Sequence, residues 1–198
     1  MPRKLPRRFY TRPALEVARD LVGKVVVHRT PEGEASGRIV ECEAYAGPRD
    51  RAAHSHQGRR TARTEAMFLE GGHAYVFFLY GMHWAFNVVC ARAGEPQAVL
   101  VRAVEPVRGL ALMARRRGLD AARRELTNGP GKVCEALGIT KAQYGADLCG
   151  DALFLEDGVP LARVARSPRV NVAYAGAHAA WPWRFYEQGN RYVSVRPR

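Results

Sequence analysis

Apolar residues recur with two different spacings in the first part of the chain. Between Thr11 and Gly23 they return every three or four residues, which predicts an amphipathic helix with Thr11 as its N-cap. Residues 24–29 are rich in β-branched side chains, and a second strand-like segment, residues 37–45, follows a turn at 31–34. We therefore predict one helix followed by two paired strands.

The strand at 37–45 has one apolar and one polar face, because its side chains alternate. The apolar face is expected to enter the core: Val40, Cys42 and Ala44. The opposite face carries Ile39, Glu41, Glu43 and Tyr45, of which two are acids. Burying two carboxylates is costly, so this pattern by itself favours a solvent-exposed face.

A second pair of apolar runs is joined by a tight turn. Residues 73–80 and 83–90 flank Gly81 and Met82, which predicts a β-hairpin. Tyr80 lies at or beside the tip, where no core is available to its ring. Tyr80 is therefore a candidate for contact with another molecule.

The remaining periodic segments predict further strands and short helices. The strands are expected at 97–104, 152–158 and 169–174, and the helices at 107–117 and 130–137. Because the strands arrive as hairpins, we predict a mixed α/β (α+β) fold over residues 1–198. It is expected to be a single domain with a curved, mostly antiparallel sheet, a protruding β-hairpin and flanking helices. Residues 1–8 are expected to form a basic, flexible arm.

Residues 46–66 have neither helical nor strand periodicity and predict a long loop. Loops of this length in a compact domain are usually functional or disordered. The loop holds two histidines, His54 and His56. It also holds four arginines: Arg51, Arg59, Arg60 and Arg63.

The chain has a large excess of basic residues, with 31 Lys and Arg against 19 Asp and Glu and a net charge of +12. This balance favours a polyanionic partner, most commonly nucleic acid. Residues 128–132 (NGPGK) open a helix whose free amides, beside Lys132, are suited to a phosphate. A cluster at 115–117 (RRR) closes the preceding helix, where it fits the helix dipole as well as it fits DNA.

The four cysteines are widely spaced and form no CxxC pair. Neither a zinc ribbon nor a disulfide framework is predicted, and reduced thiols are expected. The N-terminus has no apolar run long enough for a signal peptide or a membrane span. We therefore expect a cytoplasmic protein, or a nuclear one in a eukaryote, with no membrane partner.

Several motifs together resemble the alkyladenine (3-methyladenine) DNA glycosylase family. In chain order they are RIVECEAY-x8-HS, GR-x2-AR-x3-MF, AYVFFLYGMHWAFN, VLVRAVEP, NGPGKVCEALGI and RFYEQG-x4-VSV. The resemblance implies a monomeric, monofunctional DNA repair enzyme that uses no metal or other cofactor. Its expected substrates are damaged purines in double-stranded DNA, such as 3-methyladenine, 7-methylguanine, hypoxanthine and ethenoadenine.

The resemblance also implies a role for individual residues. Glu43 matches the general base that activates water, and Tyr80 matches the aromatic wedge that fills the gap in the duplex. The positions expected to hold the flipped nucleotide are Tyr45, His54, Phe77, Asn87 and Arg102. Phe77 stands where the mammalian type has a stacking tyrosine, so the ring is kept and a hydroxyl hydrogen bond is lost. The basic residues expected to contact the DNA backbone are Arg59, Arg60, Arg63 and Lys132.

Three other functions fit parts of the same pattern. A bifunctional glycosylase/lyase would need an amine nucleophile, for which Lys132 is the candidate. A metal-dependent nuclease could use an acidic and histidine set, although no HExxH-like spacing is present. That set would be Glu41, Glu43, Asp50, His54 and His56. A non-catalytic nucleic-acid-binding module would explain the charge and the aromatic residues, but not a carboxylate beside Tyr45.

Overall fold

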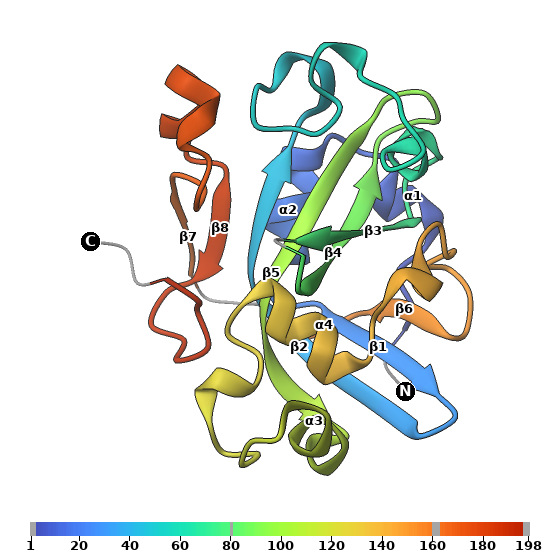
Figure 1. Cartoon of the computed structure of the whole chain (residues 1–198), viewed down its shortest axis with the longest axis vertical. Helices are drawn as coiled ribbons and strands as arrows, with labels where there is room; N and C mark the ends of the chain where they lie inside the picture. The colour runs from blue at the N-terminus through green and yellow to red at the C-terminus, as the bar shows by residue number, and fades with distance from the viewer. Residues whose placement is uncertain (1–2, 80, 160–162, 196–198) are drawn as a thin grey trace.

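A curled antiparallel sheet organises the molecule. The computed structural model describes residues 3–79, 81–159 and 163–195 (Figure 1). The strands are β1 Val25–Thr30, β2 Gly33–Tyr45, β3 Ala74–Leu79, β4 His83–Cys90, β5 Gln97–Arg108, β6 Leu153–Glu156, β7 Val164–Ser167 and β8 Arg184–Glu187. They form one sheet in the order β3-β4-β5-β2-β1-β6, with β8 paired to β2 and β7 to β8.

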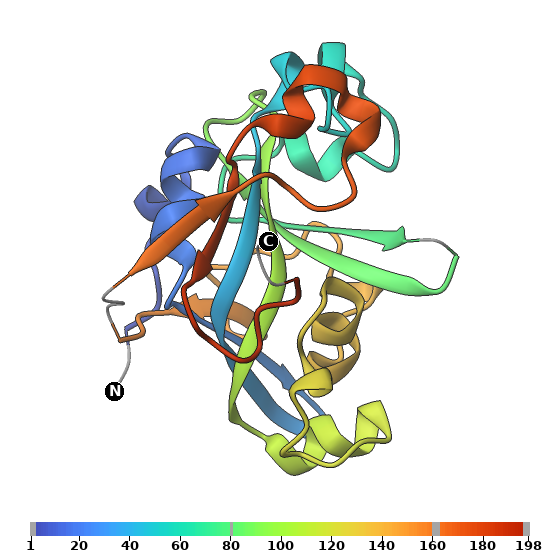
Figure 2. The same cartoon turned by 90° about the vertical axis from the view of Figure 1, so that its left-hand side faces the viewer.

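Short helices surround this sheet. The α-helices are α1 Arg7–Tyr10, α2 Ala14–Leu21, α3 Leu110–Arg117 and α4 Pro130–Leu137. The 3-10 turns are η1 Gly47–Arg49, η2 His56–Gly58, η3 Glu65–Phe68, η4 Arg124–Leu126, η5 Lys141–Gln143 and η6 Ala173–Ala180. Figure 2 shows the β3–β4 hairpin extending away from the body, on the side opposite α1 and α2. The predicted fold class, an α+β domain with an antiparallel sheet and a protruding hairpin, is confirmed.

The helices and the sheet share one large core. Helix α2 packs against β2 and β5, and α4 packs against β4 and β5. The fully buried side chains Val17, Leu21, Val133, Leu137 and Phe86 all belong to this core. Helix α4 begins at Pro130 and ends at Gly138 in a left-handed conformation, as the sequence predicts.

The predicted alternation of side chains along β2 is wrong at Ile39 and Val40. Ile39 was expected on the polar face but is buried in the main core, whereas Val40 packs in a separate cluster with Ala103 and Tyr192. The pairing of β2 with β5 shifts register between Ile39 and Glu41. A bulge of this kind adds one residue and reverses the alternation that follows it.

Further element boundaries differ from the predictions; the helix predicted with Thr11 as its N-cap begins at Ala14, and its N-cap is Pro13. Strand β5 continues past Pro106 to Arg108, because Pro106 pairs with Gly37 at a register shift that needs no regular ladder bond from the proline. Helix α3 therefore begins at Leu110 and not at 107. Residues 169–174 are not a strand, since Asn171 has a φ of 59°, outside the range of extended backbone.

The described part of the N-terminal segment is docked and not extended as a flexible arm. Lys4 forms a β-bridge with Glu156, and the amide of Leu5 donates to the carbonyl of Leu155 at 2.9 Å. The Leu5 side chain is buried. Apolar burial and main-chain pairing outweigh the charge that suggested a mobile arm. None of the helices in the described part of the chain has the length and apolarity needed to cross a bilayer.

Candidate active site

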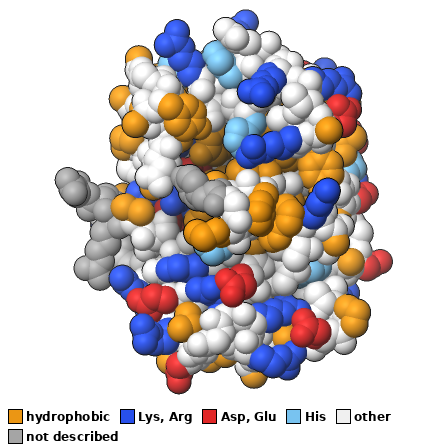
Figure 3. All heavy atoms as spheres, viewed as in Figure 1, with side chains coloured by type: hydrophobic (Ala, Val, Ile, Leu, Met, Phe, Trp, Pro, Cys, Tyr) orange, Lys and Arg blue, Asp and Glu red, His pale blue; other side chains and the backbone are white. Residues whose placement is uncertain are grey.

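A cavity of about 940 Å³ opens where several distant segments meet. Its walls come from the loop at 46–66, the β3–β4 hairpin, the start of α4, the segment at 170–174, the end of β2 and strand β5. In the upper half of Figure 3, basic, histidine and apolar side chains lie side by side on this face. The site thus combines apolar surface with positive charge.

Most of the predicted site residues line this cavity. The five residues expected to hold a nucleotide are all in its walls: Tyr45, His54, Phe77, Asn87 and Arg102. Arg59, Arg63 and Lys132 also line it, whereas Arg60 does not. The Nε of Arg60 donates to Glu65 at 2.9 Å. Tyr80 lies outside the described residues.

Glu43 lies directly behind the cavity wall and is fully buried. Its Oε2 accepts a hydrogen bond from the hydroxyl of Tyr45 at 2.8 Å, and its Oε1 accepts one from the backbone amide of Val170 at 2.7 Å. The Nη1 of Arg102 lies 3.5 Å from the same Oε1. These donors offset the cost of burying a carboxylate.

The expectation of a solvent-exposed acidic face on β2 is therefore wrong. Glu41 and Glu43 are both 0% exposed, and each has an arginine partner. Burial opposes the positive charge of Arg102, but the carboxylates of Glu43 and Glu41 outweigh it and raise the pKa of Arg102. The polar face of β2 is an internal charge network.

An aromatic wall forms the side of the cavity nearest the hairpin. The hydroxyl of Tyr75 and Nδ1 of His54 are 2.8 Å apart, and the His54 ring meets Phe77 edge-on with centroids 4.6 Å apart. The guanidinium of Arg63 lies 5.0 Å from the centre of the Phe77 ring. Burial, followed by the nearby Arg63 and Arg59, lowers the pKa of His54 to about 4. His54 is consequently neutral at pH 7.

Asn87 occupies the base of the same wall and is buried. It lies opposite Tyr75 in the β3–β4 pairing, and its Nδ2 donates to the carbonyl of Tyr75 at 3.0 Å. This bond fixes the orientation of the amide. Asn87 therefore presents polar atoms in a defined direction within an otherwise apolar wall.

A buried ion pair holds the opposite wall. Arg169 binds Asp50 through two hydrogen bonds, at 2.6 and 2.9 Å, and both side chains are fully buried. The Arg169 guanidinium lies 4.8 Å from the Tyr45 ring centre and 5.0 Å from that of Trp183. Arg169 thereby supports the Tyr45 ring and anchors the segment whose next amide, Val170, reaches Glu43.

Comparison with known proteins identifies the family of this chain. The family model described as methylpurine-DNA glycosylase (MPG) matches residues 8–191. The chain belongs to this family. A protein of Methanocella arvoryzae is 47% identical over 193 residues, covering 97% of this chain and 96% of that protein. A protein of Bacillus licheniformis is 48% identical over 190 residues, covering 96% of each. Both carry the name "Putative 3-methyladenine DNA glycosylase".

The basic residues of this DNA glycosylase divide into two groups. The arginines that close α3 are taken up by ion pairs: Arg115 and Arg116 with Glu32, and Arg117 with Glu135. This pairing supports the structural interpretation of that cluster. By contrast, Arg59 and Lys132 line the cavity, and the described residues give them no carboxylate partner. Lys132 Nζ donates to Asn128 Oδ1 at 2.7 Å.

The acids and histidines that a metal-dependent nuclease would use as metal ligands do not lie together among the described residues of the glycosylase. In the ranges that the structure describes, no three His, Cys, Asp or Glu side chains gather as metal ligands would. Asp50 is bound to Arg169, His54 faces Tyr75, and Nδ1 of His56 lies 2.9 Å from the carbonyl of Pro48.

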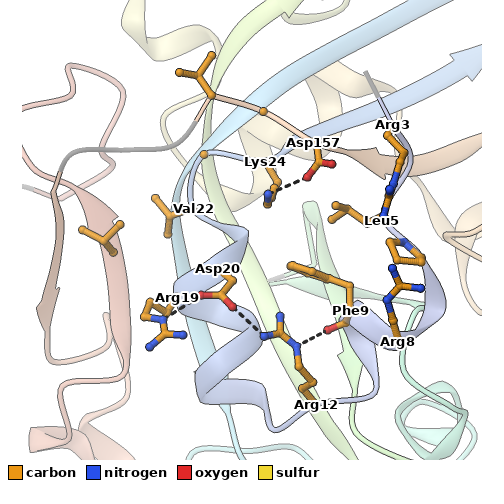
Figure 4. A pocket seen from close by; sticks show the side chains of 15 residues that line it. Arg3, Leu5, Arg8, Phe9, Arg12, Arg19, Asp20, Val22, Lys24 and Asp157 are labelled. Carbon is orange, nitrogen blue, oxygen red and sulfur yellow. Dashed lines mark hydrogen bonds and ion pairs between the residues drawn. The ribbon is translucent and has the colours of Figure 1, made fainter. Parts of the chain in front are cut away.

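A second groove, of about 660 Å³, lies between the N-terminal segment, α2 and the end of β6 (Figure 4). Its two acids are engaged by its own cations. Asp20 binds Arg12 and Arg19, and Asp157 binds Lys24. This groove shares no lining residue with the larger cavity and offers no free carboxylate for chemistry.

Sequence reasoning missed three parts of the site. Tyr75 carried a usable signal, because it lies two residues before Phe77 on one strand and so shares its face. Arg169 and the amide of Val170 carried none. They reach Asp50 and Glu43 across 119 and 127 residues of chain.

Proposed function

We propose that this glycosylase removes damaged purines of the 3-methyladenine, 7-methylguanine, hypoxanthine and ethenoadenine class from double-stranded DNA. It acts as a monomer, flips the damaged nucleotide into the large cavity and hydrolyses the N-glycosidic bond with water activated by Glu43. This cleavage initiates base excision repair. The observation that carries the proposal is a buried carboxylate, held by three donors, directly behind an aromatic cavity rimmed with arginines.

The aromatic walls are suited to an alkylated base. Stacking on an aromatic side chain contributes about 1–3 kcal/mol per base, which offsets part of the cost of extrusion from the duplex. A methylated purine is cationic and is attracted to the electron-rich faces of Tyr45 and Phe77. Neutral His54 adds no repulsion against that charge. The walls therefore favour damaged over normal purines.

The bond cleavage follows from the charge on Glu43. The sugar passes through an oxocarbenium-like state, which a nearby carboxylate stabilises. Glu43 also accepts a proton from the attacking water. Burial raises the pKa of Tyr45, and the adjacent Glu43 raises it further, so the Tyr45 hydroxyl remains a donor. An alkylated base leaves readily because it is already positively charged.

Asn87 is the proposed discriminator against normal guanine. Its amide is fixed by the bond to the Tyr75 carbonyl. The exocyclic amine of guanine would have to be placed against this fixed group in a buried wall. A buried polar group left without a partner costs about 1–3 kcal/mol, which is enough to disfavour the undamaged base.

The protruding hairpin supports the proposed wedge. Figure 2 shows β3 and β4 extending from the body, and Tyr80 follows β3 directly in the sequence. The exposed side chains of Phe78 and Met82 flank that position. An apolar wedge replaces stacking that is lost when a nucleotide leaves the duplex. Backbone contacts are proposed for Arg59, Arg60, Arg63 and Lys132.

The deciding experiment is single-turnover base release from a duplex with one damaged purine, measured in EDTA for wild type and Glu43→Gln. We expect release by the wild type and a loss of about 10²–10⁴-fold in the variant, the usual contribution of a general base. Glu16→Gln, at an exposed position on α2, is the matched control and should retain the wild-type rate.

Other outcomes point to different functions. Tight DNA binding without release from any substrate would leave a non-catalytic binding module. Equal rates in wild type and Glu43→Gln would reject Glu43 as the base. The pKa of Lys132 is lowered by burial and then by Arg117, as a nucleophilic amine requires. A borohydride-trapped DNA adduct that is lost in Lys132→Ala would therefore establish the bifunctional alternative.

A further inference from the structure

Glu41 lies beside the proposed catalytic base but does not line the cavity. Its carboxylate is fully buried and surrounded by donors. Oε1 accepts hydrogen bonds from Nε of Arg184 at 2.6 Å and Nε of Arg102 at 3.1 Å. These bonds offset part of the cost of burying the carboxylate.

The C-terminal segment supplies the remaining partners of Glu41. The backbone amide of Ser194 donates to Oε2 at 2.6 Å, and the Ser194 hydroxyl donates to Oε1 at 2.9 Å. These bonds join residues 153 positions apart in the chain. Arg184, which also binds Glu41, donates to the carbonyl of Val195. The end of the described chain is thus attached to β2 next to Glu43.

Arg102 connects Glu41 to the cavity. Its Nε binds Glu41, its Nη1 lies 3.5 Å from Glu43 Oε1, and its Nη2 donates to the Ser194 hydroxyl at 3.4 Å. Arg102 is the only one of these residues that lines the cavity in the part of the chain with described coordinates. Two carboxylates attract its guanidinium, Glu41 at Nε and Glu43 at Nη1.

The balance of charge explains why one carboxylate is not enough. Two acids, Glu41 and Glu43, face two arginines, Arg102 and Arg184, in a buried network. Removing the charge of Glu41 would leave Arg102 with Glu43 as its remaining ion-pair partner, and would leave Arg184 with none among the described residues. Arg102 would then move closer to Glu43, and its ion pair with that carboxylate, now at 3.5 Å, would tighten at the expense of water activation.

We propose that Glu41 is a positioning residue for Arg102, and that Ser194 completes the active site by holding Glu41 in place. Glu41 keeps the Arg102 guanidinium at the cavity wall and leaves Glu43 free to act on water. The proposal rests on the proposed function, since it assumes that Glu43 and Arg102 act in base release. It gives the C-terminal segment a part in catalysis without contact with the DNA.

The test is a double-mutant cycle in single-turnover base release with the full chain, using Glu41→Gln and Arg102→Ala. Glu41→Gln should slow release about tenfold to a hundredfold, the effect of losing a hydrogen bond to a charged group. In the Arg102→Ala background the same change should alter the rate less than about threefold, because Glu41 acts through Arg102. The Kd for damaged DNA should change less than the rate constant.

Two further variants keep the test decisive. Ser194→Ala removes one hydroxyl bond and retains the amide, so it should fold and slow release about twofold to tenfold. This effect should also vanish in the Arg102→Ala background. Glu105→Gln is the matched control, because it breaks an ion pair with Arg38 on the same sheet without contacting Arg102. Its rate should equal that of the wild type.

The outcomes separate this inference from the proposed function. No release by the wild type would overturn both. Release at the wild-type rate by Glu41→Gln, or by Ser194→Ala if the first variant does not fold, would overturn the positioning role alone. Equal slowing in the presence and absence of Arg102 would show that Glu41 only stabilises the fold.

Discussion

At the scale of single residues, the site is built from side chains whose charge is set by burial. Glu43 keeps its place through Tyr45, Arg102 and the Val170 amide, and the pKa of His54 is lowered to about 4. Tyr75 has its pKa raised to about 12, mainly by burial. A neutral histidine and a neutral tyrosine therefore form the hydrogen-bonded pair on the aromatic wall. No acidic side chain of the described residues lines the cavity, and the carboxylate of Glu43 lies behind its wall.

The lowered pKa of His54 predicts a contribution to the pH dependence of stability. In the unfolded chain a histidine binds its proton near pH 6.5, whereas folded His54 does so only near pH 4. The unfolded state therefore binds more protons in this window, and stability falls as pH decreases through it. The loss has an upper bound of about 3 kcal/mol, from roughly 1.4 kcal/mol per pH unit.

Urea unfolding at pH 7 and at pH 4.5 measures this contribution. His54→Gln should lose less stability between the two pH values than the wild type, because glutamine does not titrate. His28→Gln is a useful comparison, since burial also lowers the pKa of His28. Identical losses in wild type and His54→Gln would contradict the buried, neutral state of His54.

At the scale of elements, the cavity depends on close contact between the hairpin and α4. Gly131 lies in the first turn of α4, and a Cβ built there would come within 2.8 Å of Cβ and Cγ of His83 at the start of β4. Real Cβ atoms do not approach this closely. The glycine thus lets the helix start lie against the hairpin, and both elements line the cavity.

Gly131→Ala should push α4 and the hairpin apart. Overpacking of this kind costs about 1–3 kcal/mol, partly offset by the better helix propensity of alanine. Gly129→Ala is the matched control, since a Cβ there meets only the Lys132 side chain at 3.5 Å. Thermal denaturation should show Gly131→Ala to be the less stable variant, and base release should fall only in that variant. Equal stability would mean that the contact with His83 is relaxed.

At the scale of the whole molecule, the net charge is +12, and only some of the basic side chains are paired with carboxylates. The arginines of α3, at the lower end of Figure 1, are bound to Glu32 and Glu135. Those at the cavity include Arg59, which has no carboxylate partner among the described residues, and Arg63, which lies over Phe77. Cations without a carboxylate partner among the described residues thus line the cavity, whereas those that close α3 are paired.

This distribution predicts which cations contact DNA phosphates. Binding to undamaged duplex should weaken steeply with salt and show little sequence preference. Arg59→Ala and Lys132→Ala should each reduce the slope of log K against log salt by about 0.9, the value for one lost phosphate contact. Arg115→Ala, at a cation paired with Glu32, should leave the slope unchanged. A reduced slope for Arg115→Ala would instead place α3 on the DNA.

The pattern of neighbouring residues in the sequence was enough to predict the elements that local contacts stabilise. The hairpin turn at Gly81, the helix from Pro130 to Leu137 and the antiparallel pairing followed from periodicity and turn chemistry. The motif set also assigned Tyr45 and Asn87 to one site, and both residues line the cavity. The turn, the helix and the hairpin pairing depend on neighbours a few residues away, so the sequence pattern is enough to predict them.

Only the tertiary structure decided where charge is buried. The double hydrogen bond of Arg169 to Asp50, the bulge at Val40 and the Ser194 bonds to Glu41 have no local signal. A carboxylate on a strand face is solvated by default, and it becomes buried only when distant donors offset the cost of removing it from water. Those donors are brought to β2 by the fold, so the state of Glu43 is a property of the whole chain.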